Sequence, residues 1–138
     1  HKRAVKKLKD KVVDREEWGS SPQEVNAYYN PQNNKFVLLA AILNEPFFDS
    51  NGSDAVNYGG IGFVIGHEIG HCFDDMGSQF DEKGRLKNWW TKEDYATFNL
   101  LKNKLIAQAE KYEILPAIHA NGKIEIGEII ADLSGSEI

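Results

Sequence analysis

Two histidines and a glutamate are spaced so that one stretch of helix can present all three to a single metal ion. His67 and His71 are four residues apart, and Glu68 directly follows the first of them. Residues four apart lie on the same side of an α-helix, so both imidazoles can reach one cation. This H-E-x-x-H pattern is typical of zinc peptidases, in which the glutamate is the general base. So short a motif also arises by chance, and the surrounding residues must decide.

A catalytic zinc ion needs a third protein ligand and one open position for water. Glu128 and Asp132 are also four residues apart, so on a helix they share a face. Glu128 can then bind the metal while Asp132 accepts a hydrogen bond from the far nitrogen of a ligand histidine. The alternative is a solvated acidic face, which this pattern alone would favour. Beside the H-E-x-x-H motif, the metal site is the preferred interpretation.

The motif is predicted to lie in a buried helix that spans residues 58–73. Apolar residues at spacings of three and four indicate one face: Ile61, Val64, Ile65, Ile69 and Cys72. Asp54 is the expected N-cap. Gly62, Gly66 and Gly70 form a second stripe, and each glycine costs a helix about 1 kcal/mol relative to alanine. A helix that carries all three predicts another backbone packed closely against it.

A hairpin is predicted ahead of this helix, with strands at residues 25–29 and 35–39. The residues between them, 30–34, are rich in asparagine and proline and favour a turn. A hairpin with a free edge can bind an extended peptide as an additional strand through main-chain groups. The alternative is a hairpin with a purely structural role, which the pattern alone favours.

Two further helices are predicted, at residues 4–16 and 91–112. The first has an apolar face and a lysine-rich face, which interspersed acidic residues mark as solvated. Thr91 is the expected N-cap of the second. Its expected buried stripe contains Tyr95, Phe98, Leu101, Leu105, Ile106, Ala109 and Tyr112. Trp89 and Trp90, just before it, are expected in the core.

Four more residues are candidates for a role at the metal. Asp74 and Asp75 follow the motif closely, and either could orient His71 or cap a neighbouring turn. Cys72 is the single cysteine, which excludes an intramolecular disulfide, and we expect a buried structural thiol rather than a ligand. His119 as a fourth ligand would close the metal site, so we expect an ordinary loop or strand residue.

Length and charge limit the remaining possibilities. The chain has 138 residues, the length of one domain, and a formal net charge of −5, which gives no indication of nucleic-acid binding. No apolar run approaches the roughly 18 residues that a membrane-spanning helix needs, and no signal peptide is recognisable. The chain begins with His1 rather than methionine, so we expect a piece of a longer polypeptide.

Matching segments extend in order over most of residues 18–135. They are residues 25–29, 41–43, 46–48, 57–62, 73–75, 79–81 with Gly84, 89–90, 121–122, 127–128 and 130–132. With the H-E-x-x-H motif, they resemble the neprilysin family of zinc metallopeptidases, which includes the endothelin-converting enzymes and bacterial oligopeptidase O. The chain departs from the family pattern at three positions. Ile129 replaces a usual Asn, Gly70 replaces a usual Thr or Ser, and Leu39 lies near a usual Pro. None of these departures removes a ligand.

The resemblance implies a fold and a set of site residues. The fold is α+β and mainly helical: a zincin (thermolysin-like) catalytic-domain fragment with a small β-hairpin and an H-E-x-x-H helix. Residues 1–138 would form this single fragment, without the family's N-terminal helical lobe and C-terminal His/Arg segment. The implied roles are zinc ligation by His67, His71 and Glu128, catalysis by Glu68 with Asp132 supporting a ligand histidine, and substrate binding by Asn26 and Ala27.

The implied function is a zinc-dependent endopeptidase that hydrolyses oligopeptides through a water activated by one zinc ion. We expect the chain alone to be weakly active or inactive, because the family's further His and Arg lie outside it. The alternatives are a non-catalytic module stabilised by zinc and a metal-free peptide-binding fragment. The expected partners are oligopeptides and the missing parts of the parent polypeptide. A parent exported by a bacterium is expected, in the periplasm, at the cell surface or secreted, with a cytoplasmic one as the alternative.

Overall fold

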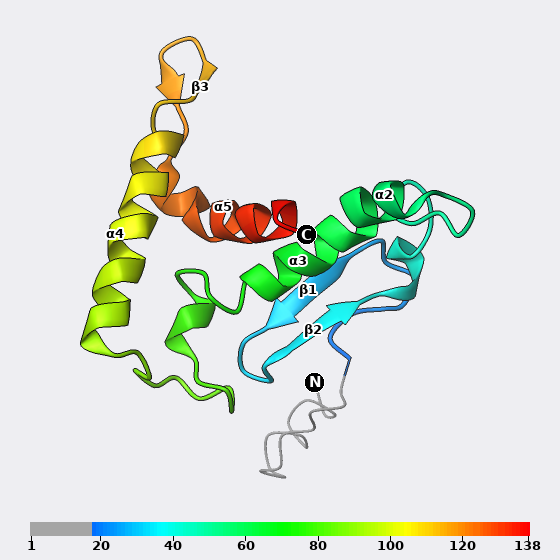
Figure 1. Cartoon of the computed structure of the whole chain (residues 1–138), viewed down its shortest axis with the longest axis horizontal. Helices are drawn as coiled ribbons and strands as arrows, with labels where there is room; N and C mark the ends of the chain where they lie inside the picture. Colours follow the sequence, from blue (N-terminus) through cyan, green and yellow to red (C-terminus); the bar gives the residue numbers. More distant parts are fainter. Residues whose placement is uncertain (1–17) are drawn as a thin grey trace, which may run out of the picture.

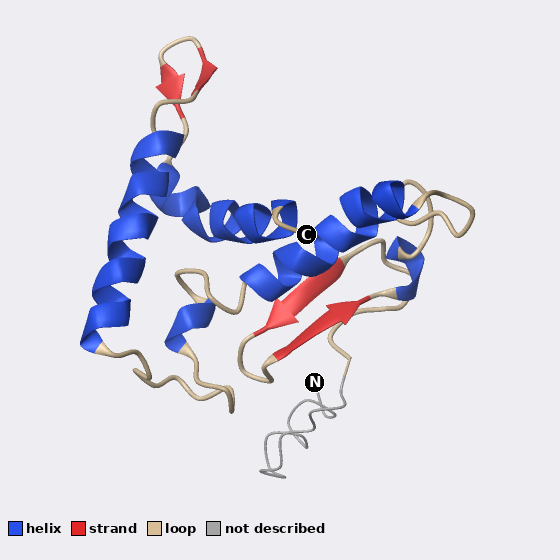
Figure 2. Cartoon of the chain, viewed as in Figure 1, coloured by secondary structure: helices blue, strands red, loops and turns tan. Residues whose placement is uncertain are grey.

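The computed structural model describes residues 18–138, and the helix predicted at residues 4–16 lies outside them. The main elements are β1 (Ala27–Asn30), β2 (Lys35–Leu38), α2 (Asp54–Asn57), α3 (Phe63–Gly70), α4 (Lys92–Ala109), β3 (Glu113–Leu115), β4 (Ile118–His119) and α5 (Gly122–Ser136). Shorter helical turns are η1 (Ala40–Ile42), the π-helical η2 (Tyr58–Gly62) and η3 (Gly77–Gln79). As predicted, the fold is mainly helical with a small β part (Figures 1 and 2).

The predicted hairpin is present, with its first strand shifted by one or two residues. β1 pairs antiparallel with β2, from Ala27 opposite Leu38 to Asn30 opposite Lys35. The turn between them ends at Asn34, which has a φ of 46°. Asparagine tolerates this left-handed conformation better than most residues. The sheet has only these two strands in the described chain, so β1 keeps one edge free of β2.

The helix that carries the motif begins and ends earlier than predicted. A continuous helical run passes from α2 through η2 into α3, and so extends from Asp54 to Gly70. Ser53, not Asp54, is the N-cap, because the serine hydroxyl accepts a hydrogen bond from the backbone N–H of Val56. The prediction that the helix continues to residue 73 was wrong: His71 is the C-cap, and the chain turns immediately after it.

The stripe of glycines in α3 packs against α5, which confirms the predicted close approach of two backbones. A Cβ atom added at Gly66 would lie 2.9 Å from the Cα of Gly135, and one at Gly70 would lie 2.9 Å from the Cα of Ala131. Figure 1 shows the C-terminal end of α5 beside α3. The predicted apolar face is only partly buried: Ile61 is buried but Ile69 is 43% exposed, because the glycine face is the one that contacts α5.

A small apolar core lies between the hairpin and the helical run that contains α3. Its buried members are Ala27, Ile42 and Ile61, and the partly buried side chains around them are Leu38, Phe47, Phe48, Val64 and Ile65. The hairpin, the turn η1 and the helical run each contribute one of the three buried side chains. Burial of these side chains therefore holds β1 beside α3.

The long helix α4 begins as predicted, but its apolar stripe is only partly buried. The hydroxyl of Thr91 accepts a hydrogen bond from the backbone N–H of Asp94, which confirms the N-cap. Ala109 is buried, whereas Tyr95 and Leu101 are 51% and 53% exposed. The stripe is partly covered by α5, where Gly122 meets the backbone of Ile106, and by Trp90, whose ring centroid is 5.2 Å from that of Phe98. Figure 1 shows α5 beside only one end of α4.

The tryptophan pair before α4 is also more exposed than predicted. Trp89 is 42% exposed, and its ring stacks on that of Trp90 with centroids 4.5 Å apart.

Within residues 18–138, every helix is too short or too polar to cross a bilayer.

The contact between α3 and α5 can be tested with one substitution and a matched control. Gly70→Ala should lower the free energy of unfolding by about 1–3 kcal/mol, because the new methyl group overlaps α5. Gly59→Ala should leave it unchanged or raise it by up to about 1 kcal/mol, since nothing lies within 4 Å of the added Cβ. Urea unfolding of both variants makes the comparison. Equal stability of the two would contradict the close packing.

Candidate active site

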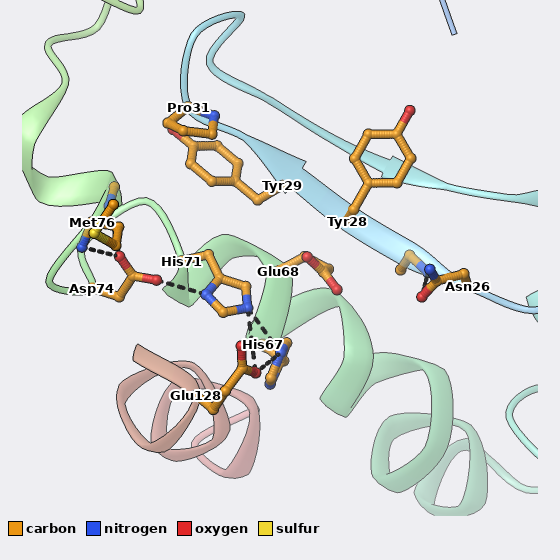
Figure 3. Close-up of a pocket in the computed structure, with 12 residues that line it drawn as sticks. Asn26, Tyr28, Tyr29, Pro31, His67, Glu68, His71, Asp74, Met76 and Glu128 are labelled. Atoms are coloured by element: carbon orange, nitrogen blue, oxygen red, sulfur yellow. Dashed lines mark hydrogen bonds and ion pairs between the residues drawn. The ribbon is translucent and has the colours of Figure 1, made fainter. Parts of the chain in front are cut away.

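The two histidines of the motif face each other at the end of α3. Their Nε2 atoms are 3.0 Å apart, and their rings are perpendicular. His67 lies in the last turn of the helix and His71 is its C-cap with αR backbone angles, so the helical register continues through both residues. Figure 3 shows both rings directed toward the same point. The spacing of four therefore places the two imidazoles as the helical period predicts.

Glu128 extends from α5 to the same point. Its Oε2 is 3.4 Å from Nε2 of His67 and 3.7 Å from Nε2 of His71. A tetrahedral zinc ion with bonds of about 2.0–2.1 Å separates its ligand atoms by about 3.3 Å. The three observed separations, 3.0, 3.4 and 3.7 Å, lie around that value. Two imidazole nitrogens and a carboxylate oxygen are also ligands that zinc prefers, so the residues present fit this ion.

Each imidazole is held from behind by a carboxylate. Nδ1 of His67 is 2.8 Å from Oδ1 of Asp132, and Nδ1 of His71 is 2.7 Å from Oδ2 of Asp74. An ionised carboxylate can only accept a hydrogen bond, so each ring carries its hydrogen at Nδ1 and leaves the lone pair of Nε2 for a metal. Asp132 thus lies where the sequence analysis predicted it, on the same face of α5 as Glu128.

The structure brings Asp74, rather than Asp75, to His71. The two roles considered for these aspartates are combined in Asp74, because its other oxygen accepts hydrogen bonds from the backbone N–H groups of Met76 and Gly77 at 2.7 and 2.6 Å. The side-chain Oδ1 of Asp75 faces Gly127 of α5 instead, and its backbone carbonyl accepts a hydrogen bond from the side-chain amide of Gln79. The sequence could not separate the two, because adjacent residues in a turn point in different directions.

Gly127 makes room for this arrangement, and the sequence analysis did not identify its role. A Cβ atom at this position would lie 2.9 Å from Oδ1 of Asp75 and 3.4 Å from Oδ2 of Asp74. The loop after α3 can therefore approach α5 one residue before Glu128. A glycine inside a predicted helix, beside a candidate ligand, was the only available signal of this contact.

Glu68 is a buried carboxylate beside the paired imidazoles. Its side chain lines a cavity that the two imidazoles also line, and only 6% of the residue is exposed. Burial raises the pKa of Glu68, because it removes water from the charged form. His71, His67 and a hydrogen bond from the backbone N–H of Tyr29 act in the opposite direction on this pKa, and Glu128 raises it further. Glu68 is therefore poised to exchange a proton within the cavity.

The free edge of β1 forms the wall opposite these side chains. The cavity has a volume of about 420 Å³ and extends from Asn26–Tyr29 of the hairpin to the imidazoles and Glu128 (Figure 3). Leu39 donates its N–H to the carbonyl of Asn26, so the next residue, Ala27, directs its main-chain groups away from β2. The N–H of Ala27 is satisfied by the side-chain oxygen of Asn26 at 2.9 Å, and the Ala27 carbonyl remains available to a peptide.

Other residues near the motif have the roles that the sequence allowed or lie elsewhere. His119 is an exposed residue of β4, as predicted, and is not part of the candidate ligand cluster among residues 18–138. Cys72 is half-buried rather than buried. Tyr29, Pro31 and Met76 also line the cavity, and the sequence analysis did not identify them as site residues.

Comparisons with known proteins agree with one another. A sequence profile of peptidase family M13 matches residues 26–138. The neutral endopeptidase of Lactococcus lactis subsp. cremoris is 46% identical over 123 residues, which are 89% of this chain and 20% of that protein. The crystal structure of the Mycobacterium tuberculosis zinc metalloprotease Zmp1 with an inhibitor has a TM-score of 0.92 and 49% identity, over 98% of this chain and 21% of that one.

A second solved structure gives the same result. PepO from Lactobacillus rhamnosis HN001 has a TM-score of 0.86 and 38% identity, over 91% of this chain and 20% of that one. The chain thus spans about a fifth of the length of the proteins that it matches.

The different positions of the two aspartates predict different effects on metal binding. Asp74→Asn should lower the affinity for zinc about 10–100-fold, because the amide cannot hold the Nδ1 hydrogen of His71 in the same way. Asp75→Asn removes the same charge from the adjacent residue and should leave the affinity nearly unchanged. Competition for zinc against a chromogenic chelator measures both constants. Equal losses in the two variants would show that only the net charge matters.

Proposed function

The chain belongs to peptidase family M13, as the resemblance to the neprilysin family predicted, and on this premise we propose that it is the zinc-binding catalytic core of an endopeptidase. Its substrates would be oligopeptides, and its architecture that of a zincin. The observation that carries the proposal is the convergence of two imidazole nitrogens and the Glu128 carboxylate at separations of 3.0, 3.4 and 3.7 Å. Glu68 lies beside this triad, in the same cavity as a free strand edge.

In this proposal His67, His71 and Glu128 would hold one zinc ion. Zinc held by such a ligand set lowers the pKa of a bound water to near 7 and polarises the carbonyl of the bond to be cut. Asp132 and Asp74 keep the two imidazoles in the tautomer and orientation that binding requires, through their contacts of 2.8 and 2.7 Å with Nδ1.

Glu68 is the proposed general base. Its carboxylate takes a proton from the attacking water and later delivers it to the nitrogen of the leaving amine, as a positioned carboxylate can. Both transfers need a group that gains and loses a proton near neutral pH. Burial raises the pKa of Glu68 in that direction, and the cavity gives water and substrate access to the side chain.

The free edge of β1 is the proposed substrate-binding strand. An extended peptide that pairs with this edge lies across the cavity from the triad, with its main chain held and its side chains left free. The carbonyl of Ala27 points to this edge and can accept a hydrogen bond from a peptide N–H. The side chain of Asn26 already occupies the Ala27 N–H, and its amide nitrogen can donate to a peptide carbonyl.

Substitution of Glu68 separates catalysis from metal binding. Glu68→Gln should lower peptide turnover by about 10²–10⁴-fold, because the amide cannot accept the proton of water. Its zinc content should equal that of the unchanged protein, since Glu68 is not among the three proposed ligands. Glu125→Gln, an equal charge change at an exposed position of α5, is the control and should affect neither. Turnover of a fluorogenic oligopeptide and metal analysis measure both properties.

The control for the metal itself is His67→Ala, which should lose zinc and activity together. Loss of zinc from Glu68→Gln would make Glu68 a structural or ligand residue. These variants are made in the natural polypeptide that carries this chain. Zinc retention without any turnover by that unchanged polypeptide would favour a non-catalytic module stabilised by metal.

A further inference from the structure

A tight loop from Asp81 to Arg85, here called the brace loop, is organised by one buried carboxylate. Oδ1 of Asp81 accepts from the backbone N–H groups of Lys83 and Arg85, both at 3.0 Å. Oδ2 accepts from Nε and Nη2 of Arg85 at 2.8 and 2.5 Å. These hydrogen bonds lower the pKa of Asp81 to about 2, so the carboxylate stays ionised and the loop keeps its shape.

The tip of the brace loop presses against the turn between β1 and β2. Gly84 has a φ of +72°, and a Cβ atom there would lie 1.9 Å from the carbonyl oxygen of Gln32. Both facts require glycine at this position. Beside this contact, the side-chain amide of Asn34 donates to the carbonyl of Glu82 at 3.1 Å. Two independent contacts therefore join the loop to the turn.

The contact continues from the turn into the strand that faces the site. Oδ1 of Asn34 accepts a hydrogen bond from the hydroxyl of Tyr29, in β1, at 3.0 Å. Burial raises the pKa of Tyr29, so the phenol keeps the proton that it donates. Tyr29 lines the same cavity as Glu68 and the two imidazoles. Asn34 thus lies between the brace loop and a strand residue of the cavity wall.

The segment that carries the brace loop is also fastened to the metal side of the cavity. Asp74, which holds His71, accepts the N–H of Gly77 at 2.6 Å. The next carbonyl, that of Ser78, accepts from the indole N–H groups of Trp89 and Trp90 at 3.0 and 2.9 Å. One segment is therefore tied to the imidazole pair at its start and to the β1–β2 turn at the brace loop.

We propose that the brace loop sets the width of the substrate cleft, with Asn34 and Gly84 as positioning residues for the edge of β1. The physical need is clear, because a two-stranded hairpin is marginally stable by itself and its turn would otherwise move relative to α3. The proposal rests on the proposed function, in which an oligopeptide pairs with this edge. Substitutions in the brace loop should therefore raise KM more for a substrate that pairs with a longer stretch of β1.

Two substitutions test the proposal against a matched control in the same turn. Asn34→Gly keeps the left-handed backbone, with its φ of 46°, and removes both side-chain hydrogen bonds. Gly84→Ala forces the loop away from the turn. Gln32→Ala is the control, because Gln32 meets Gly84 through its backbone carbonyl, which the substitution retains. All are made in the natural polypeptide that carries this chain, loaded with zinc.

The readout is the kinetics of a long and a short substrate. For an oligopeptide that spans the edge of β1, KM should rise about tenfold in both variants, as the loss of one or two hydrogen bonds implies. For a doubly blocked dipeptide, kcat and KM should stay as in the unchanged protein, as should the zinc content. Gln32→Ala should resemble the unchanged protein with both substrates. An equal change in KM or kcat for both substrates would show a merely structural role and overturn the proposal.

Hydrogen exchange keeps this inference separate from the proposed function. If the unchanged protein cleaves neither substrate, the proposed function fails, and the brace is tested by exchange of the Tyr29 backbone amide. This amide should exchange faster in Asn34→Gly and Gly84→Ala and at the original rate in Gln32→Ala. Unchanged exchange in the first two variants would overturn the positioning role.

Discussion

The close contact between α3 and α5 is the constraint on which the site depends. α3 provides His67 and Glu68 and ends at His71, while Glu128 and Asp132 belong to α5, far along the chain. The carboxylate of Glu128 reaches the imidazoles because Gly66 and Gly70 let the two backbones come together. Each glycine costs α3 about 1 kcal/mol of helix propensity, and this cost is offset by close packing. The same contact brings Asp132 to the back of His67.

The arrangement of charge around the imidazoles favours a divalent cation. Four carboxylates surround the two rings: Glu68, Asp74, Glu128 and Asp132. Like charges this close repel each other, and Glu128 accordingly raises the pKa of Glu68. A zinc ion between Glu128 and the imidazoles would relieve much of this repulsion. The proposed metal binding and the proposed role of Glu68 as a base would thus both depend on one cluster of acids.

The other wall of the cavity is held by different means. β1 has one neighbouring strand, and its position beside α3 depends on the small core around Ala27 and Ile61 and on contacts at its turn. Those contacts are polar and local: Asn34 bonds both Tyr29 and Glu82, and Gly84 meets Gln32. The wall formed by α3 and α5 relies on helix packing, whereas the wall formed by β1 relies on hydrogen bonds between loops. The two sides can therefore respond differently to substitution.

What the sequence alone determined is the short-range part of this structure. The helical period places His67 with His71 and Glu128 with Asp132, since it depends only on local backbone geometry. The N-cap at Thr91 and the hairpin turn follow from local hydrogen bonding for the same reason. The glycine stripe even predicted that a backbone would pack there, although not which one.

Only the tertiary structure decided the contacts between segments. It selected Asp74 over Asp75, ended α3 at Gly70 rather than at residue 73, and left part of the apolar stripe of α4 exposed. It also brought Gly84 to Gln32, which no local pattern indicates. These outcomes depend on which surfaces distant segments present to each other, and periodicity or capping within one segment carries no information about a partner more than a few residues away.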